Sequence, residues 1–307
     1  MTNSDWTPGE ADERTAQILR GVLERYRAFW PMPVRQAFYQ VVKAGGAGLW
    51  LDEYGNFLRS VRAGLVGGLL PTAAIADEAH EVREGGAWED PSEFVHSEIE
   101  SFLWGYRRNL LDGQERHVEV WVQKPALLDQ VSEVAVEYCV TTVTCRRTPT
   151  PKFMDELRGR LAAARERHPS GVVLFFGDYS PGDTSFLQRV RETLHAEGNV
   201  WETEFRQEAV VADDVARHEL PESVASRSRR SHAAADPTRS PVELEAFAPD
   251  VLADRVRAAI EAQLDMSLVN NQRALQSREA LRLGKLRASI LRQIRATLRD
   301  FMPREEA

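Results

Sequence analysis

An aspartate stands where a buried strand turns into a helix, and a carboxylate in that place can hold a cation. The run from Val172 to Phe176 is apolar, and Gly177 and Asp178 end it before a turn through Ser180-Pro-Gly leads into a helical pattern. In α/β sheets, groups at the carboxyl ends of parallel strands face the crevice in which ligands bind. Asp178 is therefore a candidate ligand of a divalent cation. The alternative is an ordinary strand-to-helix turn in which this aspartate caps the helix.

A second strand end presents an amide and an ammonium group. Residues 117–122 alternate polar and apolar side chains, and Gln123, Lys124 and Pro125 follow before a helical run over 126–136. Proline is common at the start of a helix. The ammonium group of Lys124 would pair with a phosphate or neutralise a neighbouring carboxylate, and the alternative is a lysine that is only solvated.

A third pair of candidates lies near the N-terminus, on a helix predicted over Val34–Lys43. Arg35 and Tyr39 are four residues apart, so they lie one turn apart on the same face. This spacing lets a guanidinium group sit beside a phenol and a phosphate. The alternative is a core tyrosine whose ring is buried and whose hydroxyl is hydrogen-bonded.

These segments resemble a known family. The strand ends at Gln123 and Asp178 look like those of the TOPRIM domain of topoisomerases, primases and some nucleases, where one strand ends in Glu, usually followed by Lys, and a later one in Asp-x-Asp. Pro33-Val-Arg-Gln-Ala-Phe-Tyr39 is similar to the Val-Arg-x-x-(Phe/Tyr)-Tyr signature in the winged-helix domain of topoisomerase VI A subunits and their meiotic strand-breaking relatives. The likeness covers roughly residues 20–265 and includes a bacterial and phage branch of the family.

The resemblance implies a chemistry for each candidate. Tyr39 falls on the nucleophile that attacks a DNA phosphodiester, Arg35 would contact the phosphate, and Lys124 belongs to the same site. The acids of the family bind magnesium, which stabilises the developing charge. This chain departs from the pattern twice, because Gln123 stands in the place of the glutamate and Ser180 in the place of the second aspartate.

Asp178 is the family acid that the chain keeps. One carboxylate with an amide is a poor ligand set for Mg²⁺, which prefers several hard anionic oxygens. Asp183, five residues further on, and Glu119, which shares the strand face of Gln123, are candidate substitutes. We expect Mg²⁺ or Mn²⁺ to be held weakly by these residues and Ser180, or to have been lost.

The elements that must position these groups follow from the periodicity. From residue 117 onward, strand and helix alternate, with strands expected at 117–122, 139–144, 171–176 and around 199–206. This order predicts an α/β fold with a largely parallel sheet covered by helices. Before residue 112 the apolar spacing is helical, at 11–29, 34–43, 51–61, 71–80 and 92–111.

Three regions are expected from this order. Residues 12–112 form a helical, winged-helix-like domain, residues 113–265 a TOPRIM-like, Rossmann-like domain, and residues 266–307 a C-terminal amphipathic helix. The C-terminal region carries nine basic and four acidic residues, and it would pack on its own chain, mediate a dimer or track DNA.

Two stretches before the C-terminal helix carry charge. Ser223–Ser240 is rich in serine, arginine and histidine and has little that is apolar, which indicates a mobile surface loop. Its basic residues would follow a phosphate backbone or be solvated. Val242–Asp250 also looks like the family and contains two further acids, Glu243 and Glu245.

Composition bounds the class of protein. A chain of 307 residues can bury the cores of two domains. The net charge of −8 argues against a protein that binds nucleic acid nonspecifically along its length. A local basic groove is compatible with this charge. With no apolar run of membrane-spanning length and no basic, apolar leader, we expect a cytoplasmic protein. The spacing of Cys139 and Cys145 does not suggest zinc, and a reducing compartment is the simpler interpretation.

Two hypotheses of function follow. The first is metal-dependent DNA strand cleavage or transesterification with Tyr39 as nucleophile. The second is a catalytically degenerate TOPRIM module that binds DNA or assembles a complex. A third hypothesis is a nucleotide-binding domain, since the Gly-Asp turn before a helix can receive a phosphate. The expected partners are DNA, with a second copy of the chain and an ATPase or other subunit as further alternatives, because topoisomerase VI A subunits act with an ATPase.

Overall fold

The computed structural model describes residues 10–49, 51–77, 85–146, 148–180, 185–196, 201–224 and 240–298. The chain divides into two units. Unit 1 comprises Met1–His80 and Glu115–Leu264, and unit 2 comprises Glu81–Gln114 and Asp265–Ala307. In unit 2, the segment that ends at Gln114 is bonded to the C-terminal helix, because Arg108 donates hydrogen bonds to Gln276 and Glu279.

Unit 1 is a mixed α/β structure, as the sequence predicts. Within the described residues, its parallel sheet has the strand order β2-β1-β3-β4. The strands are β1 Arg116–Val122, β2 Thr141–Thr144, β3 Ser170–Phe176 and β4 Thr203–Ala209. β1 and β3 pair along their whole length, with Val122 opposite Phe176, so both strands end at the same edge of the sheet.

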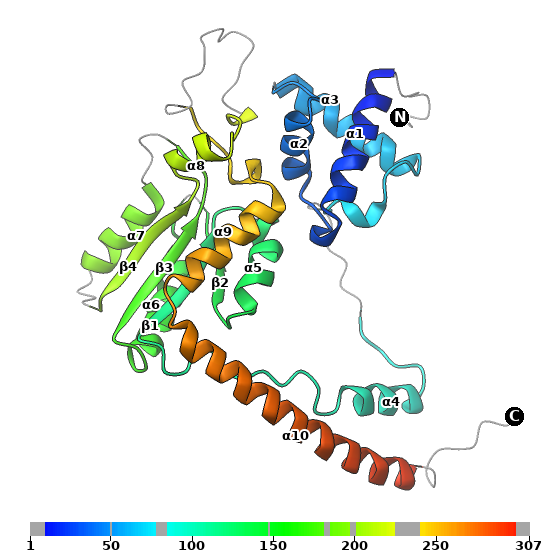
Figure 1. Cartoon of the computed structure of the whole chain (residues 1–307), viewed down its shortest axis with the longest axis vertical. Helices are drawn as coiled ribbons and strands as arrows, with labels where there is room; N and C mark the ends of the chain where they lie inside the picture. Colours follow the sequence, from blue (N-terminus) through cyan, green and yellow to red (C-terminus); the bar gives the residue numbers. More distant parts are fainter. Residues whose placement is uncertain are drawn as a thin grey trace, which may run out of the picture. The chain divides into compact units, whose positions relative to one another are not determined.

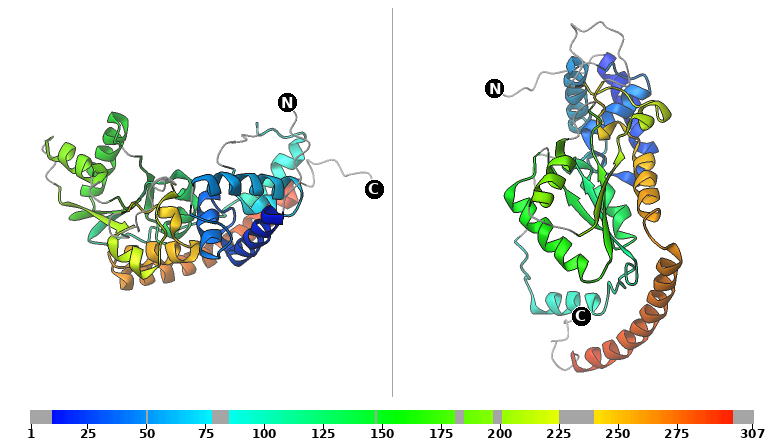
Figure 2. Two further views of the ribbon diagram at one scale, coloured as in Figure 1. Left: turned by 90° about the horizontal axis from the view of Figure 1, so that it is seen from above. Right: turned by 90° about the vertical axis from the view of Figure 1, so that its left-hand side faces the viewer.

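Helices cover both faces of this sheet (Figure 1). Trp121, Phe175 and Phe205 pack on one face against α6 and α7. On the other face lie α5 and α9, which also pack against each other (Figure 2). Because both faces are covered, β3 is apolar from Val172 to Phe176, whereas β1 also carries the buried acid Glu119. The helices are α5 Leu128–Val136, α6 Pro151–Arg165, α7 Ser185–Ala196, α8 Ala212–Arg217 and α9 Pro249–Glu261.

Unit 1 also contains an N-terminal group of helices around a core that includes Leu23, Phe38 and Phe57. The helices are α1 Glu10–Arg25, α2 Val34–Lys43 and α3 Leu51–Val66. α2 has the bounds that the sequence predicts. The helix expected over 71–80 is wrong for its described part, which contains only the 3₁₀ turn Thr72–Ala74 and an extended residue, Ile75, that pairs with Met32.

Unit 2 is built on two helices, α4 Pro91–Ser101 and α10 Met266–Leu298. The helix expected over 92–111 ends earlier, at Ser101, and an irregular segment follows it. The Arg287 guanidinium group donates hydrogen bonds to the carbonyl oxygens of Phe102 and Glu100, each at 2.8 Å, and thereby caps the end of α4. The C-terminal helix therefore packs on its own chain.

Two further observations bear on the class of protein. None of the helices in the described ranges is both long and apolar enough to cross a bilayer. Cys139 and Cys145 are free thiols, the second of them buried. The basic stretch between Val224 and Ser240 lies outside the described residues.

Candidate functional site

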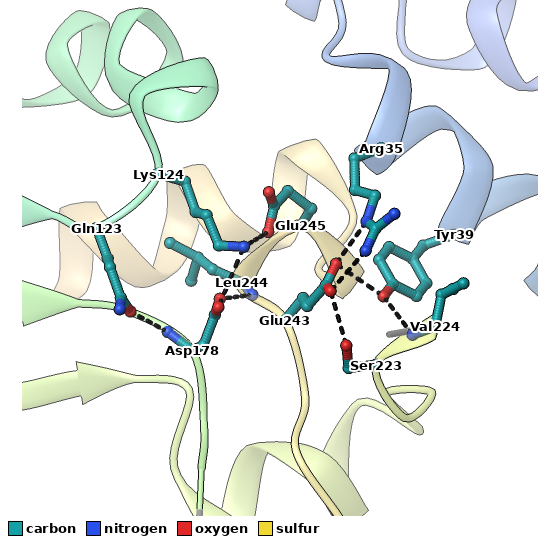
Figure 3. A network of polar contacts seen from close by, with 10 residues as sticks. All are labelled: Arg35, Tyr39, Gln123, Lys124, Asp178, Ser223, Val224, Glu243, Leu244 and Glu245. Carbon is teal, nitrogen blue, oxygen red and sulfur yellow. Dashed lines mark hydrogen bonds and ion pairs between the residues drawn. The ribbon is translucent and has the colours of Figure 1, made fainter. Parts of the chain in front are cut away.

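The ends of β1 and β3 bring together two of the residues singled out in the sequence. The Gln123 backbone N–H donates to the Phe176 carbonyl oxygen at 2.9 Å. The Gln123 Oε1 atom in turn accepts a hydrogen bond from the backbone N–H of Asp178 at 2.8 Å (Figure 3). A Cβ atom on Gly177 would lie 2.6 Å from this Oε1 atom, so only glycine fits between the two strand ends. Gln123 thus fixes the turn that presents Asp178.

The carboxylate of Asp178 joins a small, partly buried group that we call the Glu245 cluster, made of Lys124, Asp178 and Glu245. The Asp178 Oδ1 atom accepts from the backbone N–H of Leu244 at 2.9 Å. The Lys124 Nζ atom lies 3.1 Å from Asp178 Oδ2 and 3.1 Å from Glu245 Oε2. One ammonium group therefore lies within ion-pair distance of two carboxyl groups (Figure 3).

The Glu245 cluster has two carboxyl groups and one ammonium group. Burial raises the pKa of Glu245 to about 7, and the charge of Lys124 opposes this only in part. Lys124 lies within ion-pair distance of Glu245 Oε2 but outside hydrogen-bond geometry, and among the described residues this buried oxygen has no hydrogen-bond partner. Burial lowers the pKa of Lys124, but the two carboxylates outweigh it and raise the pKa overall. The lysine therefore remains charged at neutral pH.

A second group, the Glu243 cluster, is made of Arg35, Tyr39, Ser223 and Glu243. The Arg35 guanidinium group holds both oxygens of Glu243 at 2.7 Å in a bidentate pair. The Ser223 hydroxyl donates to Oε1 at 2.7 Å, and the Tyr39 hydroxyl donates to Oε2 at 2.9 Å. Burial raises the pKa of Glu243, but these hydrogen bonds outweigh burial and hold the pKa at about 2.

Tyr39 is enclosed by this arrangement. Its side chain has no solvent exposure, and its hydroxyl also accepts a hydrogen bond from the backbone N–H of Val224 at 3.2 Å. Burial, together with the charge of Glu243, raises the pKa of the phenol well above its ordinary value. A carboxylate with a pKa near 2 is a weak base. Glu243 therefore orients the phenol but leaves the proton on it.

The same face of α2 makes further contacts with the segment after Glu243. The Gln36 and Gln40 side-chain amides donate to the Phe247 carbonyl oxygen at 3.4 and 3.3 Å. Arg35 also lies over the Tyr54 ring, 4.5 Å from its centroid. α2 is thus bonded to the region of the strand ends through a buried polar network.

Glu119, the predicted substitute ligand on β1, lies elsewhere. Its buried carboxylate accepts from the Trp121 indole N–H at 2.8 Å and from the Arg160 Nε–H at 2.9 Å. These contacts place it on the sheet face covered by α6 and not among the contacts of Asp178. Burial raises the pKa of Glu119, but His117 and Arg160 outweigh it and lower the pKa overall. Glu119 is therefore an ion-pair partner of Arg160 between the sheet and α6.

The donor set at the strand ends does not fit Mg²⁺. The Gln123 oxygen is occupied by a backbone N–H, and the positive charge between Asp178 and Glu245 is already supplied by Lys124. Within the described ranges, no group of three or more His, Cys, Asp or Glu residues has a metal-binding arrangement. Ser180 is half-buried beside this turn, and Asp183 lies outside the described residues.

Sequence reasoning identified Glu243 and Glu245 as acids of interest but did not find their partners. One signal was available, since both acids alternate with apolar residues in Val242-Glu-Leu-Glu-Ala-Phe, a pattern that is unusual for solvated carboxylates. The structure thus joins Arg35 and Tyr39 to one acid and Lys124 and Asp178 to the other. Comparisons with known protein families, with curated proteins and with solved structures found no match to this chain.

Proposed function

We propose that the chain is a DNA-binding module of topoisomerase VI A-like descent, in which a winged-helix-like N-terminal region and a TOPRIM-like sheet are kept and strand cleavage has been lost. The motif at Pro33–Tyr39 and the strand ends at Gln123 and Asp178 carry the resemblance. The parallel sheet with helices on both faces is compatible with it. The DNA-binding part of the proposal is based on this family resemblance.

The observation that carries the loss of cleavage is the state of Tyr39. A nucleophile must reach the phosphorus atom and must lose its proton to a base. Tyr39 is fully buried, its hydroxyl is hydrogen-bonded on both sides, and its acceptor Glu243 has a pKa of about 2. These properties favour a structural tyrosine that ties α2 to the strand ends.

The Glu245 cluster supports the same proposal. Metal-assisted cleavage of a phosphodiester requires a cation bound by anionic oxygens. Here Lys124 neutralises Asp178 and Glu245, and the residues in the places of the two other family acids, Gln123 and Ser180, are uncharged. An ammonium group is a fixed counter-ion and offers no open coordination position.

The test combines a binding assay and a cleavage assay on the full chain. Binding to a fluorescently labelled DNA duplex is followed by anisotropy, and supercoiled plasmid is incubated with the protein and Mn²⁺ and then denatured to detect protein attached to DNA. We expect salt-dependent binding and no covalent adduct. Tyr39→Phe should bind DNA as the unchanged chain does. An adduct that disappears in Tyr39→Phe would overturn the proposal, and so would an absence of duplex binding, which would favour a complex-assembly module.

A second candidate function, cleavage by Tyr39, is favoured by one observation. Arg35 and Tyr39 both bind Glu243. This acid directly precedes the 3₁₀ turn Leu244–Ala246, which contains Glu245, the ion-pair partner of Lys124. The residues that the resemblance assigns to catalysis therefore converge on one segment.

This second candidate is tested by restoring the missing acids. The double variant Gln123→Glu and Ser180→Asp adds two anionic oxygens, which Mn²⁺ prefers as ligands. Titration calorimetry compares its Mn²⁺ affinity with that of the unchanged chain and of the neutral control Ser180→Asn. Stronger binding together with a Tyr39-dependent adduct in the double variant would support retained catalytic geometry. Equal Mn²⁺ affinity in all three proteins would exclude these positions as ligands.

A further inference from the structure

α10 has a packed face that is held by side-chain contacts within unit 2. Glu279, on this face, pairs with Arg108 at 2.8 Å and accepts a hydrogen bond from the Tyr106 hydroxyl at 2.6 Å. Arg287 caps the end of α4 from the same side. Leu291 is buried there. These contacts fix the rotation of the helix about its axis.

The opposite face of α10 carries a basic stripe, which we define as Arg278, Arg282, Lys285 and Arg292. All four side chains are exposed. Their spacing of four, three and seven residues keeps them on one line along a helix of 3.6 residues per turn. The stripe extends over about 21 Å, at 1.5 Å per residue.

The stripe has a single sign of charge. Between Met266 and Leu298 the sequence has seven basic residues and one acid, Glu279. Arg108 and Tyr106 bind this acid on the packed face, and its charge also acts on Arg282 of the stripe. One acid against four basic side chains leaves the stripe positive. This contrasts with the whole chain, whose net charge is −8.

We infer that the basic stripe of α10 binds the phosphate backbone of duplex DNA, an inference that rests on the proposed function and locates one binding surface. A duplex carries a phosphate charge about every 1.7 Å along its axis, so a stripe of this length faces several phosphates. Three of the four side chains are arginine, whose planar fork matches phosphate oxygens. Contacts of this kind position a protein on DNA without reading its sequence.

The competing partner is a second copy of the chain. α4 presents the exposed acids Glu93, Glu98 and Glu100, which could pair with the stripe of another molecule. The phosphate backbone fits better, since α10 offers a continuous line of charge with a uniform sign and phosphates repeat along a line. The two partners are separated by measuring DNA affinity and molecular mass on the same variants.

The experiment compares two fourfold variants of the full chain, each losing four positive charges. The stripe variant is Arg278→Gln, Arg282→Gln, Lys285→Gln and Arg292→Gln. The control variant replaces exposed basic residues on or beside α6 and α7, namely Lys152→Gln, Arg165→Gln, Arg167→Gln and Arg189→Gln. Circular dichroism checks that both remain folded. Anisotropy of a labelled duplex is recorded over a range of salt concentrations, and sedimentation equilibrium gives the mass.

Each phosphate contact adds about 0.9 to the slope of log affinity against log salt. The stripe variant should therefore lose about 3.6 from the magnitude of this slope if all four residues bind phosphates, whereas the control variant should keep the slope. Equal slopes in both variants would overturn the inference while leaving the proposed function standing. A stripe variant that binds DNA normally but has half the mass would also overturn it, in favour of a second copy. If the unchanged chain binds no duplex, the proposed function and the inference both fail.

Discussion

Glu243 and Glu245 are two residues apart on one short segment and are almost equally buried, yet they are in opposite electrostatic states. Glu243 accepts hydrogen bonds from Arg35, Tyr39 and Ser223, and its pKa is held at about 2. Glu245 lies near the cation Lys124 and the acids Asp178 and Glu243, and burial raises its pKa to about 7. Burial disfavours the charge of both carboxylates. Hydrogen bonds to the charged form decide which of them keeps it.

The difference also separates two roles. The Glu243 cluster is fully bonded, so it holds α2 in a defined place. The Glu245 cluster shares one ammonium group between two acids and leaves a buried oxygen without a hydrogen bond among the described residues. Buried carboxylates with a raised pKa are frequent at functional sites.

The largest expected effect is on stability when Glu243 loses its charge. Glu243→Gln should lower the free energy of unfolding by about 3 kcal/mol at neutral pH, because it leaves the mostly buried Arg35 charge beside a neutral amide. Glu245→Gln, the matched control, should leave it unchanged or raise it at neutral pH, because the amide stays neutral where burial opposes the charge of the glutamate. Urea denaturation of both variants measures these values. Equal losses would show that the two clusters do not differ in this way.

The pH dependence of stability should have two limbs, one from each glutamate. Glu243 has a folded pKa of about 2 against an ordinary value of 4.5, so its contribution is present above pH 4.5 and is lost as pH falls toward 2. Glu245 has a folded pKa of about 7, so its contribution is present below pH 4.5 and is lost as pH rises toward 7. Each limb amounts to at most about 3 kcal/mol.

Thermal or urea unfolding between pH 2 and 8 detects the two limbs. The limb from pH 4.5 to 2 should weaken in Glu243→Gln, and the limb from pH 4.5 to 7 should weaken in Glu245→Gln. A neutral limb that persists unchanged in Glu245→Gln would contradict the assignment to this residue.

A smaller effect is expected from the ammonium group of the Glu245 cluster. Lys124→Met removes the positive charge that lies 3.1 Å from Glu245, and the pKa of this glutamate should rise by about one unit or more. The neutral limb of the stability curve should therefore move to higher pH. The acid limb, which belongs to Glu243, should move less, because Lys124 contributes less to the low pKa of Glu243 than the hydrogen bonds from Arg35 and Ser223 do. An equal shift of both limbs would mean that the two clusters are strongly coupled.

The smallest effect is expected for the phenol of Tyr39. Tyr39→Phe should lower the free energy of unfolding by about 1 to 2 kcal/mol, the usual value of the two hydrogen bonds that the hydroxyl makes, because the ring remains buried and Glu243 keeps Arg35 and Ser223. Urea denaturation tests this value. An unchanged stability would indicate a hydroxyl that contributes no net bond, and a loss of several kcal/mol would indicate that the phenol organises the whole Glu243 cluster.

Much of the architecture was predictable from local patterns. Alternation and apolar runs located the four strands to within a few residues, and the bounds of α2 follow from Pro33 and the apolar spacing after it. The same patterns placed Arg35 and Tyr39 on one helix face and Gln123 and Asp178 at strand ends. These features depend on neighbours within a few residues, which the periodicity of a helix or strand records directly.

Only the tertiary structure decided what these side chains bond to. Arg35 and Glu243 are 208 residues apart, and Gln123 reaches Asp178 across 55 residues, so no periodic pattern relates the partners. The same is true of the burial of Tyr39 and of Lys124 between two acids. The sequence by itself determined which groups stand at the ends of which elements. Packing decided whether each group is charged, solvated or enclosed, because desolvation and hydrogen bonding depend on distances between distant segments.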